Sequence, residues 1–484
     1  MGLKQSVVSG AIWTGLEKIL TQLVHFVIGI VLARILSPGD YGVVGMLTIF
    51  IAIANVFTDS GLSSALIQKK NRTDTDYSTI FYFNLAVAVF FYCLLFFTSP
   101  LIADFYNMPI LKDVTRVVAL SLIITGFTAV QSTRLRINLQ FRKLSVIAIA
   151  SMLVTGGTGL FLAFNGFGVW ALVIQTVAGN LFSSVCVWCV AKWRPSLVFS
   201  KESFKSLWGV GSKLLGSSLI NSLYSNLYTL VIGKFFSKEQ VGYYNRGNQY
   251  ALLPMQSVQD MALKVNFPVL SKLQDDDVRL IAAYKKLMTV PLYLLYPILV
   301  GLAVVAPYLI PIMIGEKWIP CVPVLQLLCI GYMLSPLTSL NLNLLYVKGR
   351  TDLVLKLEFF KKPIGFLILF LSIPLGLVGM VAGKAFYEFV AFSFNCYYTK
   401  KFYDYGEWKQ LRALLPIVVN CVVMAFLVHV SMCFVDSYLI KLCVGIPVGI
   451  ISYLILSIVC GDENYKELKS IVKGRLHKET DNVE

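Results

Sequence analysis

Long runs of apolar residues with almost no charge constrain this chain more than any other feature. Residues 81–102, 144–164, 290–314 and 411–433 are the strongest of these runs. About 20 such residues cross roughly 30 Å of hydrocarbon as a helix, whereas a barrel strand would show about 10 residues of alternating polarity. Only 14% of the 484 residues are charged, against about 25% in soluble proteins. The sequence predicts an all-α integral membrane protein.

Counting the apolar runs predicts about fourteen transmembrane helices. Basic residues are retained on the cytoplasmic side of a membrane. With both termini and every second loop on one side, that side receives most of the Lys and Arg residues, so both termini are predicted to be cytoplasmic. The net charge of +16 fits loops that face anionic lipid and requires no nucleic-acid partner. The predicted spans are 11–35, 41–66, 77–103, 114–133, 144–164, 167–191, 207–233, 240–263, 287–314, 321–346, 353–373, 377–399, 411–433 and 437–460.

One phrase occurs twice, 200 residues apart. "VLARILSPGDYGVVG" at 31–45 is echoed by "VIGKFFSKEQVGYYN" at 231–245, with apolar residues matching between the shared positions. Ala33, Arg34, Ser37 and Gly42 correspond to Gly233, Lys234, Ser237 and Gly242. Repeats with an even number of spans produce two similarly oriented halves in many secondary transporters. We therefore predict two six-helix bundles and two peripheral C-terminal helices. The predicted parts are an N-terminal lobe at 1–200, a C-terminal lobe at 201–406, two additional helices at 407–460 and a cytoplasmic tail at 461–484.

Polar residues recur every four positions within the first span of each bundle. In the first span they are Glu17, Thr21 and His25, and in the seventh Asn221 lies between two serines at the same spacing. A four-residue step keeps side chains on one helical face. A charge at the bilayer centre costs about 2.5–3.5 kcal/mol, so the stripes either line a polar pathway or hold helices together. The candidate polar or ion-coupling residues are Glu17, Thr21, His25, Asn55, Asp59, Asn221 and Asp260.

Basic residues within spans are the candidates for holding an anion. The predicted set is Lys18, Lys213, Arg246 and Lys384, with the remaining Lys and Arg assigned to loops and span ends. No Walker A sequence, nucleophile elbow or Rossmann fingerprint occurs, and the three histidines have no zinc-site spacing. We therefore predict no catalytic residues, no metal site and no cofactor, and a transporter rather than an enzyme.

Four phrases carry a resemblance to a known family. "LARILSPGDYGVVGM" at 32–46, "FTDSGLSSALIQKK" at 57–70, "GYYNRGNQYALLPMQ" at 242–256 and "FPVLSKLQDD" at 267–276 resemble the oligosaccharide flippases of the WzxC and TuaB type. These belong to the MOP superfamily with the MATE exporters and the MurJ-like lipid II flippases. The resemblance implies two six-helix lobes in a V shape and outward flipping of an undecaprenyl-diphosphate-linked oligosaccharide across the bacterial inner (cytoplasmic) membrane by alternating access.

The resemblance also implies roles and partners. Basic cavity residues would hold the diphosphate of the lipopolysaccharide or exopolysaccharide precursor, and Lys18, Lys213, Arg246 and Lys384 match that role. The implied partners are the lipid-linked oligosaccharide, the phospholipid bilayer, a proton or sodium ion, and the polymerase and glycosyltransferases of the same pathway. Two alternatives stay open. A MATE-like cation-coupled exporter of small organic molecules would require an acidic, aromatic cavity, and a polysaccharide polymerase or ligase would require a large periplasmic loop.

Overall fold

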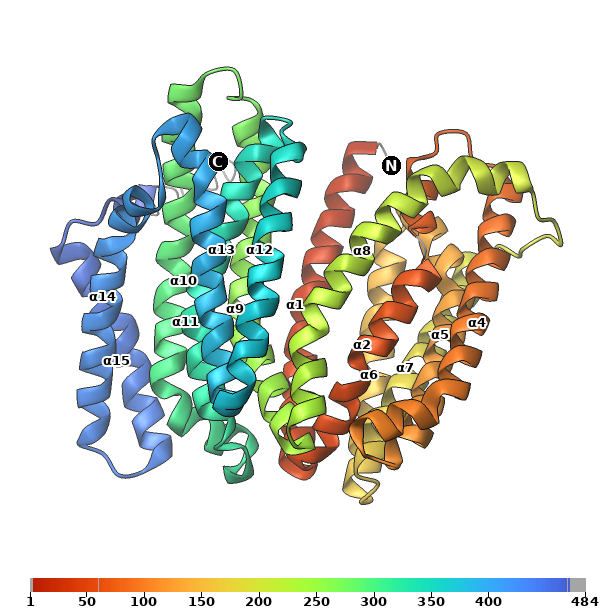
Figure 1. Cartoon of the computed structure of the whole chain (residues 1–484), viewed down its shortest axis with the longest axis horizontal. Coiled ribbons are helices and arrows are strands. Elements are labelled where there is room, and N and C mark those ends of the chain that lie inside the picture. The colour runs from red at the N-terminus through yellow and green to blue at the C-terminus, as the bar shows by residue number, and fades with distance from the viewer. Residues whose placement is uncertain (1–2, 60, 468, 471–484) are drawn as a thin grey trace, which may run out of the picture. The chain divides into compact units, whose positions relative to one another are not determined.

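The computed structural model describes residues 3–59, 61–467 and 469–470, with side chains described from Trp13 onward except at 14–16 and 19. Within these residues every regular element is a helix (Figure 1). Most of the predicted tail at 461–484 lies outside the described residues. The first eight helices are α1 (Leu3–Ile35), α2 (Pro38–Asp59), α3 (Leu62–Gln68), α4 (Asp74–Tyr106), α5 (Ile110–Ile137), α6 (Phe141–Phe164), α7 (Val169–Ala191) and α8 (Lys201–Phe235).

The second part of the chain continues in the same way. Its elements are α9 (Lys238–Ser271), α10 (Asp277–Ile314), η1 (Glu316–Trp318), α11 (Cys321–Val347), α12 (Thr351–Ser372), η2 (Ile373–Leu375), α13 (Gly376–Tyr403), α14 (Glu407–Cys433) and α15 (Tyr438–Val459). Each of the fourteen predicted helices is present in the described part of the chain, which confirms that prediction. The short helix α3 is an addition that the apolar runs did not predict.

Hydropathy separates the helices into two kinds. Ten described segments are long and apolar enough to cross a membrane, with α12 and α13 forming one of them. Helices α8 and α9 are not among these segments. Their many polar and charged residues lower their mean hydropathy. In α1 the segment from Leu20 to Ile35 is apolar.

The described chain forms two compact units, residues 1–245 and 246–484, with the boundary inside α9. Helices α4 and α5, α6 and α7, and α1 and α6 pack as neighbours in the first unit, and α8 lies against α2, α3 and α4. In the second unit α11 packs against α13, and α14 and α15 pack together and against α10. The predicted lobe boundary at residue 200 divides the chain differently and stays a prediction.

The stretch between α7 and α8 is anchored to the first unit. Trp193 is 6% exposed and joins an apolar cluster with Leu66 and Ile80. Its indole N–H donates to Asp74 over 3.2 Å, and the backbone N–H of Ser200 donates to the hydroxyl of Thr79 over 3.1 Å. This basic stretch is therefore a packed connection.

The repeated phrase forms the same turn twice. Before α2, the backbone N–H of Ser37 donates to the carboxylate of Asp40 over 2.9 Å. Before α9, Ser237 donates in the same way to the side chain of Gln240 over 3.2 Å. Both are capping boxes, in which a serine and the residue three positions later satisfy each other's backbone N–H groups. The shared serine thus has a local physical cause.

The two copies of this turn also pack against each other within the first unit. A Cβ on Gly42 would lie 1.7 Å from the carbonyl oxygen of Lys238, and a Cβ on Gly242 would lie 2.1 Å from that of Pro38. These four positions are related by the offset of 200, so the contact is reciprocal. Only glycine permits backbones to approach this closely, which explains why both copies keep it.

Helix α10 contains Pro291, Pro297, Pro307 and Pro311. A proline inside a helix leaves the carbonyl four residues earlier without its usual donor. The carbonyl groups of Leu287, Tyr293 and Ala303 are freed in this way. Side chains from other helices replace the missing donors: Asn266 to Leu287 over 3.3 Å, Tyr453 to Tyr293 over 2.9 Å, and Gln326 to Ala303 over 2.9 Å. Helix α10 is therefore bonded to α9, α15 and α11.

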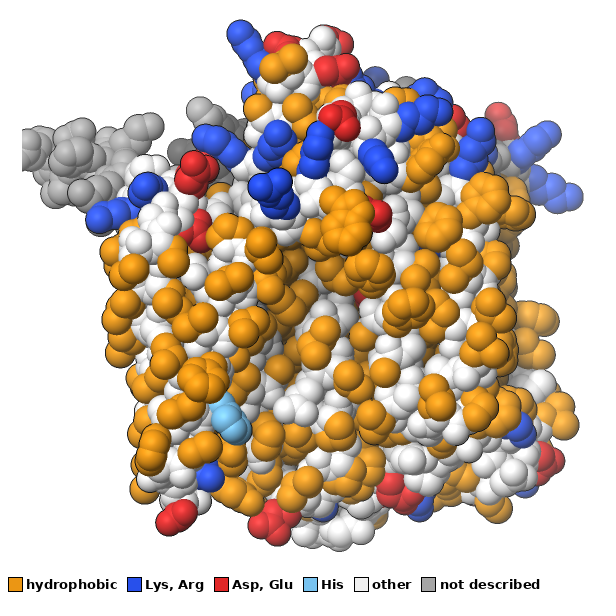
Figure 2. Space-filling model, turned by 60° about the vertical axis from the view of Figure 1, so that its left-hand side comes forward, with side chains coloured by type: hydrophobic (Ala, Val, Ile, Leu, Met, Phe, Trp, Pro, Cys, Tyr) orange, Lys and Arg blue, Asp and Glu red, His pale blue; other side chains and the backbone are white. Residues whose placement is uncertain are grey.

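The outward face of the second unit is apolar. Phe426 on α14 and Ile450 and Ile455 on α15 are more than half exposed. Figure 2 shows exposed apolar side chains covering the middle of the face, with Lys and Arg gathered at one end. A soluble protein rarely exposes such a continuous apolar surface, so this face is suited to contact lipid.

Candidate functional site

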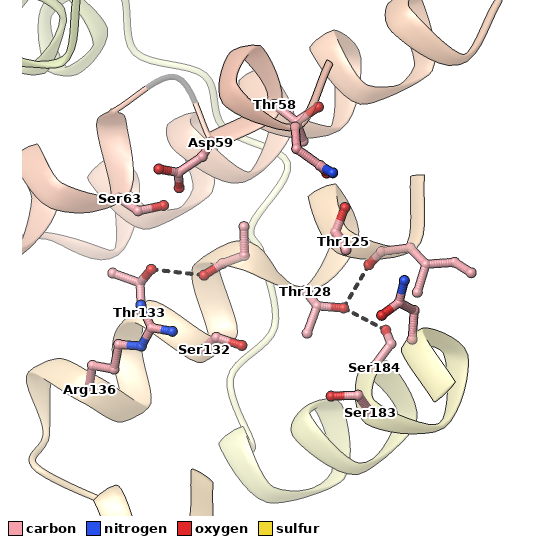
Figure 3. Close-up of a pocket in the computed structure, with 14 residues that line it drawn as sticks. Thr58, Asp59, Ser63, Thr125, Thr128, Ser132, Thr133, Arg136, Ser183 and Ser184 are labelled. Carbon is pink, nitrogen blue, oxygen red and sulfur yellow. Dashed lines mark hydrogen bonds between the residues drawn. The ribbon is translucent and has the colours of Figure 1, made fainter. Parts of the chain in front are cut away.

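A cavity of about 360 Å³ lies among α2, α3, α5 and α7 in the first unit (Figure 3). Two of the predicted site residues, Asn55 and Asp59, line it. Most of the other lining groups are hydroxyls, which sequence analysis did not identify. The full polar lining consists of Asn55, Thr58, Asp59, Ser63, Thr125, Thr128, Ser132, Thr133, Arg136, Asn180, Ser183 and Ser184. We call this cavity the hydroxyl pocket.

The threonine hydroxyls of the hydroxyl pocket are held by their own helices. Thr58 donates to the carbonyl of Ala54 over 2.9 Å, and Thr133 donates to that of Ala129 over 2.8 Å. The hydroxyl of Thr128 lies 2.8 Å from the carbonyl oxygen of Ile124 and 2.6 Å from the hydroxyl of Ser184. Since these hydrogens are used inside the protein, the threonine oxygens present their lone pairs.

The two charged groups of the hydroxyl pocket have no partner among the described residues. Asp59 and Arg136 are both exposed, and neither makes a hydrogen bond or ion pair with any described residue. Asp59 is the last residue of α2, and Arg136 lies in the last turn of α5. Charged side chains of either sign are therefore available to a ligand at one end of the pocket.

The α1 stripe includes a structural contact. The carboxylate of Glu17 accepts a hydrogen bond of 2.6 Å from Ser145 of α6, and Thr21 donates to the carbonyl of Glu17 over 2.6 Å. These contacts favour a role for Glu17 in packing α1 against α6. The side chains of Lys18 and His25 on α1, and of Lys213 and Asn221 on α8, are exposed in the same unit.

Lys384 of α13 takes part in a polar network of the second unit. Its ammonium group lies 3.2 Å from Asn248 Oδ1 and 3.0 Å from the hydroxyl of Tyr332. The Tyr332 hydroxyl in turn bonds Asn248 over 2.5 Å. Helices α9, α11 and α13 thus meet around one ammonium group. These two neutral partners fix its position, and Glu388, one turn further along α13, acts on it electrostatically.

Two further lysines lie inside α12, within the predicted span 353–373, and the predicted set of basic residues in spans wrongly omitted them. Lys361 is 4% exposed, and its ammonium group lies 2.5 Å from Glu358 and 3.3 Å from Asn395. Lys362 lies 3.5 Å from the other oxygen of Glu358. The carboxylate is one helical turn from both lysines, because positions three and four apart share a face. The sequence spacing therefore contained the signal for this cluster.

The remaining predicted residues of the second unit lie on α9. Arg246 is 6% exposed, donates to Gln249 over 2.8 Å, and its guanidinium lies 6.0 Å from the ring centre of Trp318. Asp260, about four turns further along α9, is exposed. Lys361, Lys362 and Lys384 all act electrostatically on Glu388 of α13, and we call these three lysines the basic cluster. It differs from the predicted set by including the two α12 lysines and by omitting Arg246 and the first-unit residues Lys18 and Lys213.

The second unit contains a cavity of a different chemical character. This cavity of about 450 Å³ lies among α10, α14 and α15, and its lining is apolar apart from the tyrosines at 293 and 453. Gly445 and Gly449 form part of its wall on α15. This cavity suits a hydrocarbon chain and offers no group that would bind an anion.

Comparison with protein families identifies one that matches most of the chain. The family described as "Polysaccharide biosynthesis protein" matches residues 31–323. The lipopolysaccharide biosynthesis protein WzxC of Escherichia coli (strain K12) is 28% identical over 385 residues, covering 78% of this chain and 76% of the relative. The teichuronic acid biosynthesis protein TuaB of Bacillus subtilis (strain 168) is 28% identical over 353 residues, covering 72% of this chain and 73% of the relative. The succinoglycan biosynthesis transport protein ExoT of Rhizobium meliloti (strain 1021) is 27% identical, covering 70% of this chain and 68% of the relative.

Solved structures share the fold. The lipid II flippase MurJ in an inward closed conformation has a TM-score of 0.77 at 16% identity, covering 95% of this chain and 99% of MurJ. An inward-facing multidrug resistance MATE transporter of the MOP superfamily has a TM-score of 0.61 at 16% identity, covering 82% of this chain and 95% of the transporter. The chain is a multi-span membrane protein that shares its fold with these MOP-superfamily structures, and it belongs to the polysaccharide biosynthesis protein family.

Proposed function

We propose that this protein is a transporter that moves an undecaprenyl-diphosphate-linked oligosaccharide from the inner to the outer leaflet of a bacterial cytoplasmic membrane. The names of its relatives support a cargo from surface polysaccharide synthesis, namely lipopolysaccharide and teichuronic acid. The fold shared with a lipid II flippase supports a lipid-linked form of that cargo. The polymerase and glycosyltransferases of the same pathway would then supply and consume the cargo.

A polar route is a physical requirement for such a cargo. A diphosphate with attached sugars cannot cross hydrocarbon, because each unsatisfied polar group costs several kcal/mol there. Its isoprenoid tail can stay in lipid throughout. Helices α8 and α9 are too polar to rank among the apolar spans, and each offers polar side chains for such a route. Lys18 and Lys213 would add positive charge along it.

The basic cluster is the observation that carries this proposal. Lys384 is held by Asn248 and Tyr332, and Lys361 and Lys362 share the carboxylate of Glu358. Glu388 also acts electrostatically on these three lysines, so three ammonium groups face two carboxylates. Placing this much positive charge within membrane-spanning helices is costly. An anionic headgroup offsets that cost, since lysine binds phosphate well as a point charge. We therefore assign the diphosphate to the basic cluster.

The proposed direction follows from charge. The positive-inside pattern supports cytoplasmic termini, and an inside-negative potential favours outward movement of an anion. Each charge that crosses the full field gains about 2.3 kcal/mol per 100 mV. Alternating access between the lobes at 1–200 and 201–406 would carry the headgroup, with a proton or sodium ion returning the empty carrier.

Reconstituted vesicles test the proposed function. A fluorescent undecaprenyl-diphosphate-linked saccharide is placed in both leaflets, and its accessibility to an impermeant quencher is followed under a potassium diffusion potential. We expect potential-dependent flipping that Lys384→Met slows about tenfold, the cost of one charged hydrogen bond. Lys441→Met is the matched control, because Lys441 on α15 lies over Tyr308, outside the basic cluster.

Two outcomes would contradict the proposal. Transport of ethidium without any movement of the lipid-linked saccharide would favour a MATE-like exporter of organic cations. Equal flipping rates in the wild type, Lys384→Met and Lys361→Met would show that the basic cluster does not hold the diphosphate.

A further inference from the structure

We propose that the hydroxyl pocket of the first unit binds a saccharide unit of the cargo. This inference rests on the proposed function and deepens it by separating two parts of the cargo. The diphosphate is assigned to the basic cluster, and the sugar to the hydroxyl pocket. The argument depends on hydrogen-bonding capacity, charge, helix ends and volume.

The hydroxyl pocket has the donor and acceptor balance of a sugar site. Thr58, Thr125 and Thr133 each donate their hydrogen to a carbonyl of their own helix, so their oxygens accept. The serines and the amides of Asn55 and Asn180 supply donors. Each sugar hydroxyl donates once and accepts up to twice. A wall that alternates acceptors with donors therefore matches a polyol better than it matches an anion, which only accepts.

The charge of the hydroxyl pocket also favours a saccharide over a diphosphate. Its lining contains one carboxylate and one guanidinium, those of Asp59 and Arg136, so their formal charges cancel. The carboxylate would repel a diphosphate. In contrast, carboxylates accept hydrogen bonds from pairs of sugar hydroxyls, and the planar guanidinium offers five donors. Either group would give a charge-assisted hydrogen bond to a neutral sugar.

The position of Asp59 is electrostatically unfavourable, and no contact with a described residue offsets this. A helix carries partial negative charge at its C-terminus, where an acidic side chain is unfavourable. Asp59 is the final residue of α2 and makes no hydrogen bond or ion pair with the described part of the chain that would offset this cost. Arg136, in contrast, suits the end of α5 electrostatically. A ligand that donates to Asp59 would supply the missing stabilisation.

The volume of the hydroxyl pocket suits a small ligand, and its position suits the side of the membrane on which transport would begin. Its volume of about 360 Å³ lies within the 300–1,000 Å³ of typical small-molecule sites, near the lower end. It lies toward the C-terminal ends of α2 and α5, which the predicted orientation assigns to the cytoplasmic side. A sugar attached to its lipid on that side would meet this site before crossing.

Thiol protection tests the proposal directly. Ser132→Cys introduces a thiol of similar size into the wall of the hydroxyl pocket, and peptide mass spectrometry follows its alkylation by N-ethylmaleimide in nanodiscs. The probes are single hexoses, N-acetylhexosamines and hexuronates, with betaine as an osmolyte control. The exposed native Cys189 on α7, outside the pocket lining, is the internal reference. We expect at least one sugar to slow alkylation of the introduced thiol but not of Cys189.

Variants then connect the hydroxyl pocket to the sugar. Asp59→Asn and Arg136→Gln should each abolish protection and slow flipping of the lipid-linked saccharide about tenfold. Arg134→Gln is the matched control, because Arg134 lies on the same helix end but against the rings of Tyr77 and Trp193. Thermal unfolding of each variant in detergent identifies any that fails to fold, and Ser183→Ala then serves as a milder replacement.

The outcomes are distinguishable. Flipping by the wild type without protection by any sugar overturns this inference and leaves the proposed function standing. Protection by a sugar without flipping of any lipid supports a saccharide site and overturns the proposed function. Protection by sodium chloride but not by choline chloride, with no effect of sugars, would make the hydroxyl pocket an ion site and overturn the inference.

Discussion

The hydroxyl pocket and the basic cluster handle polar groups in opposite ways. In the hydroxyl pocket, Asp59 and Arg136 are exposed and unpartnered within the described residues. In the basic cluster, Lys361 is 4% exposed and bonded to both Glu358 and Asn395. A charged side chain buried away from water requires oppositely charged or hydrogen-bonding partners, whereas a charged side chain exposed to water does not. The basic cluster thus contributes contacts to the fold, whereas the charges of the hydroxyl pocket contribute none within the described residues and are available to a ligand.

This contrast limits what the internal repeat preserves. The turns before α2 and α9 keep the same capping serine and the same contact glycine. The polar interiors of the two units have no such correspondence. Backbone geometry at the turns is therefore common to both copies, while the chemistry offered to a cargo differs between the units.

The largest effect on stability is expected for Lys361→Met. Removing this ammonium leaves Glu358 without its closer partner, and breaking a buried ion pair costs about 3–5 kcal/mol. Because Glu358 is 31% exposed and retains Lys362, we expect the lower end, about 3 kcal/mol. Denaturant unfolding in detergent micelles measures the change. The double variant Glu358→Leu/Lys361→Met should recover part of it, and a double variant no more stable than Lys361→Met would contradict the pairing.

The shared turn should be nearly as sensitive in both copies. Gly42→Ala and Gly242→Ala each place a Cβ against a backbone carbonyl, and overpacking of this kind typically costs about 1–3 kcal/mol. Gly216→Ala on α8 is the control, because a Cβ there meets no atom within 4 Å. Thermal unfolding of the three variants checks the expectation. Equal stability of Gly42→Ala and Gly216→Ala would show that the contact tolerates a methyl group.

A smaller, functional effect is expected for Tyr332→Phe. This change removes one of the two neutral partners of Lys384 and leaves its charge in place. We expect a loss of several-fold in flipping, less than that of Lys384→Met, because one net hydrogen bond contributes about 1 kcal/mol. Vesicle assays on both variants decide the order. A greater loss in Tyr332→Phe would indicate that the hydroxyl itself contacts the cargo.

The smallest effect on stability is expected in the hydroxyl pocket. Asp59→Asn should change the free energy of unfolding by less than about 0.5 kcal/mol, since exposed groups without partners contribute little. A change in activity without a change in stability would separate the two sites by role. If Asp59→Asn instead destabilised the protein as strongly as Lys361→Met, the contrast between the sites would be lost.

Periodicity and apolar length were sufficient to predict the helices, because each transmembrane helix must satisfy its own backbone. They were also sufficient to predict Asn55 and Asp59 as polar members of α2. The rest of the hydroxyl pocket was missed, although Thr125, Thr128 and Ser132 recur at helical spacing on α5. Their meeting with Ser184 of α7 depends on which helices are neighbours, and periodicity within one helix contains no such information.

The lysines of α12 were missed for a different reason. Lys361 and Lys362 lie within the predicted span 353–373 but were omitted from the predicted basic set, although charge in a span is expensive. Glu358, three and four residues before them on the same helix, pairs with both lysines and offsets the energetic cost of their charges. Charge in a span should therefore be assessed together with its neighbours one turn away.

The proline-freed carbonyls of α10 have a consequence for the length of the chain. Tyr453 satisfies the Tyr293 carbonyl, yet it belongs to α15, which lies outside the duplicated twelve helices. If the protein were shortened after α13, that oxygen would face hydrocarbon unbonded. Such a group costs several kcal/mol in lipid. The final helical hairpin thus completes the hydrogen bonding of α10, so its removal would first destabilise α10, which is distant in the sequence from the point of truncation.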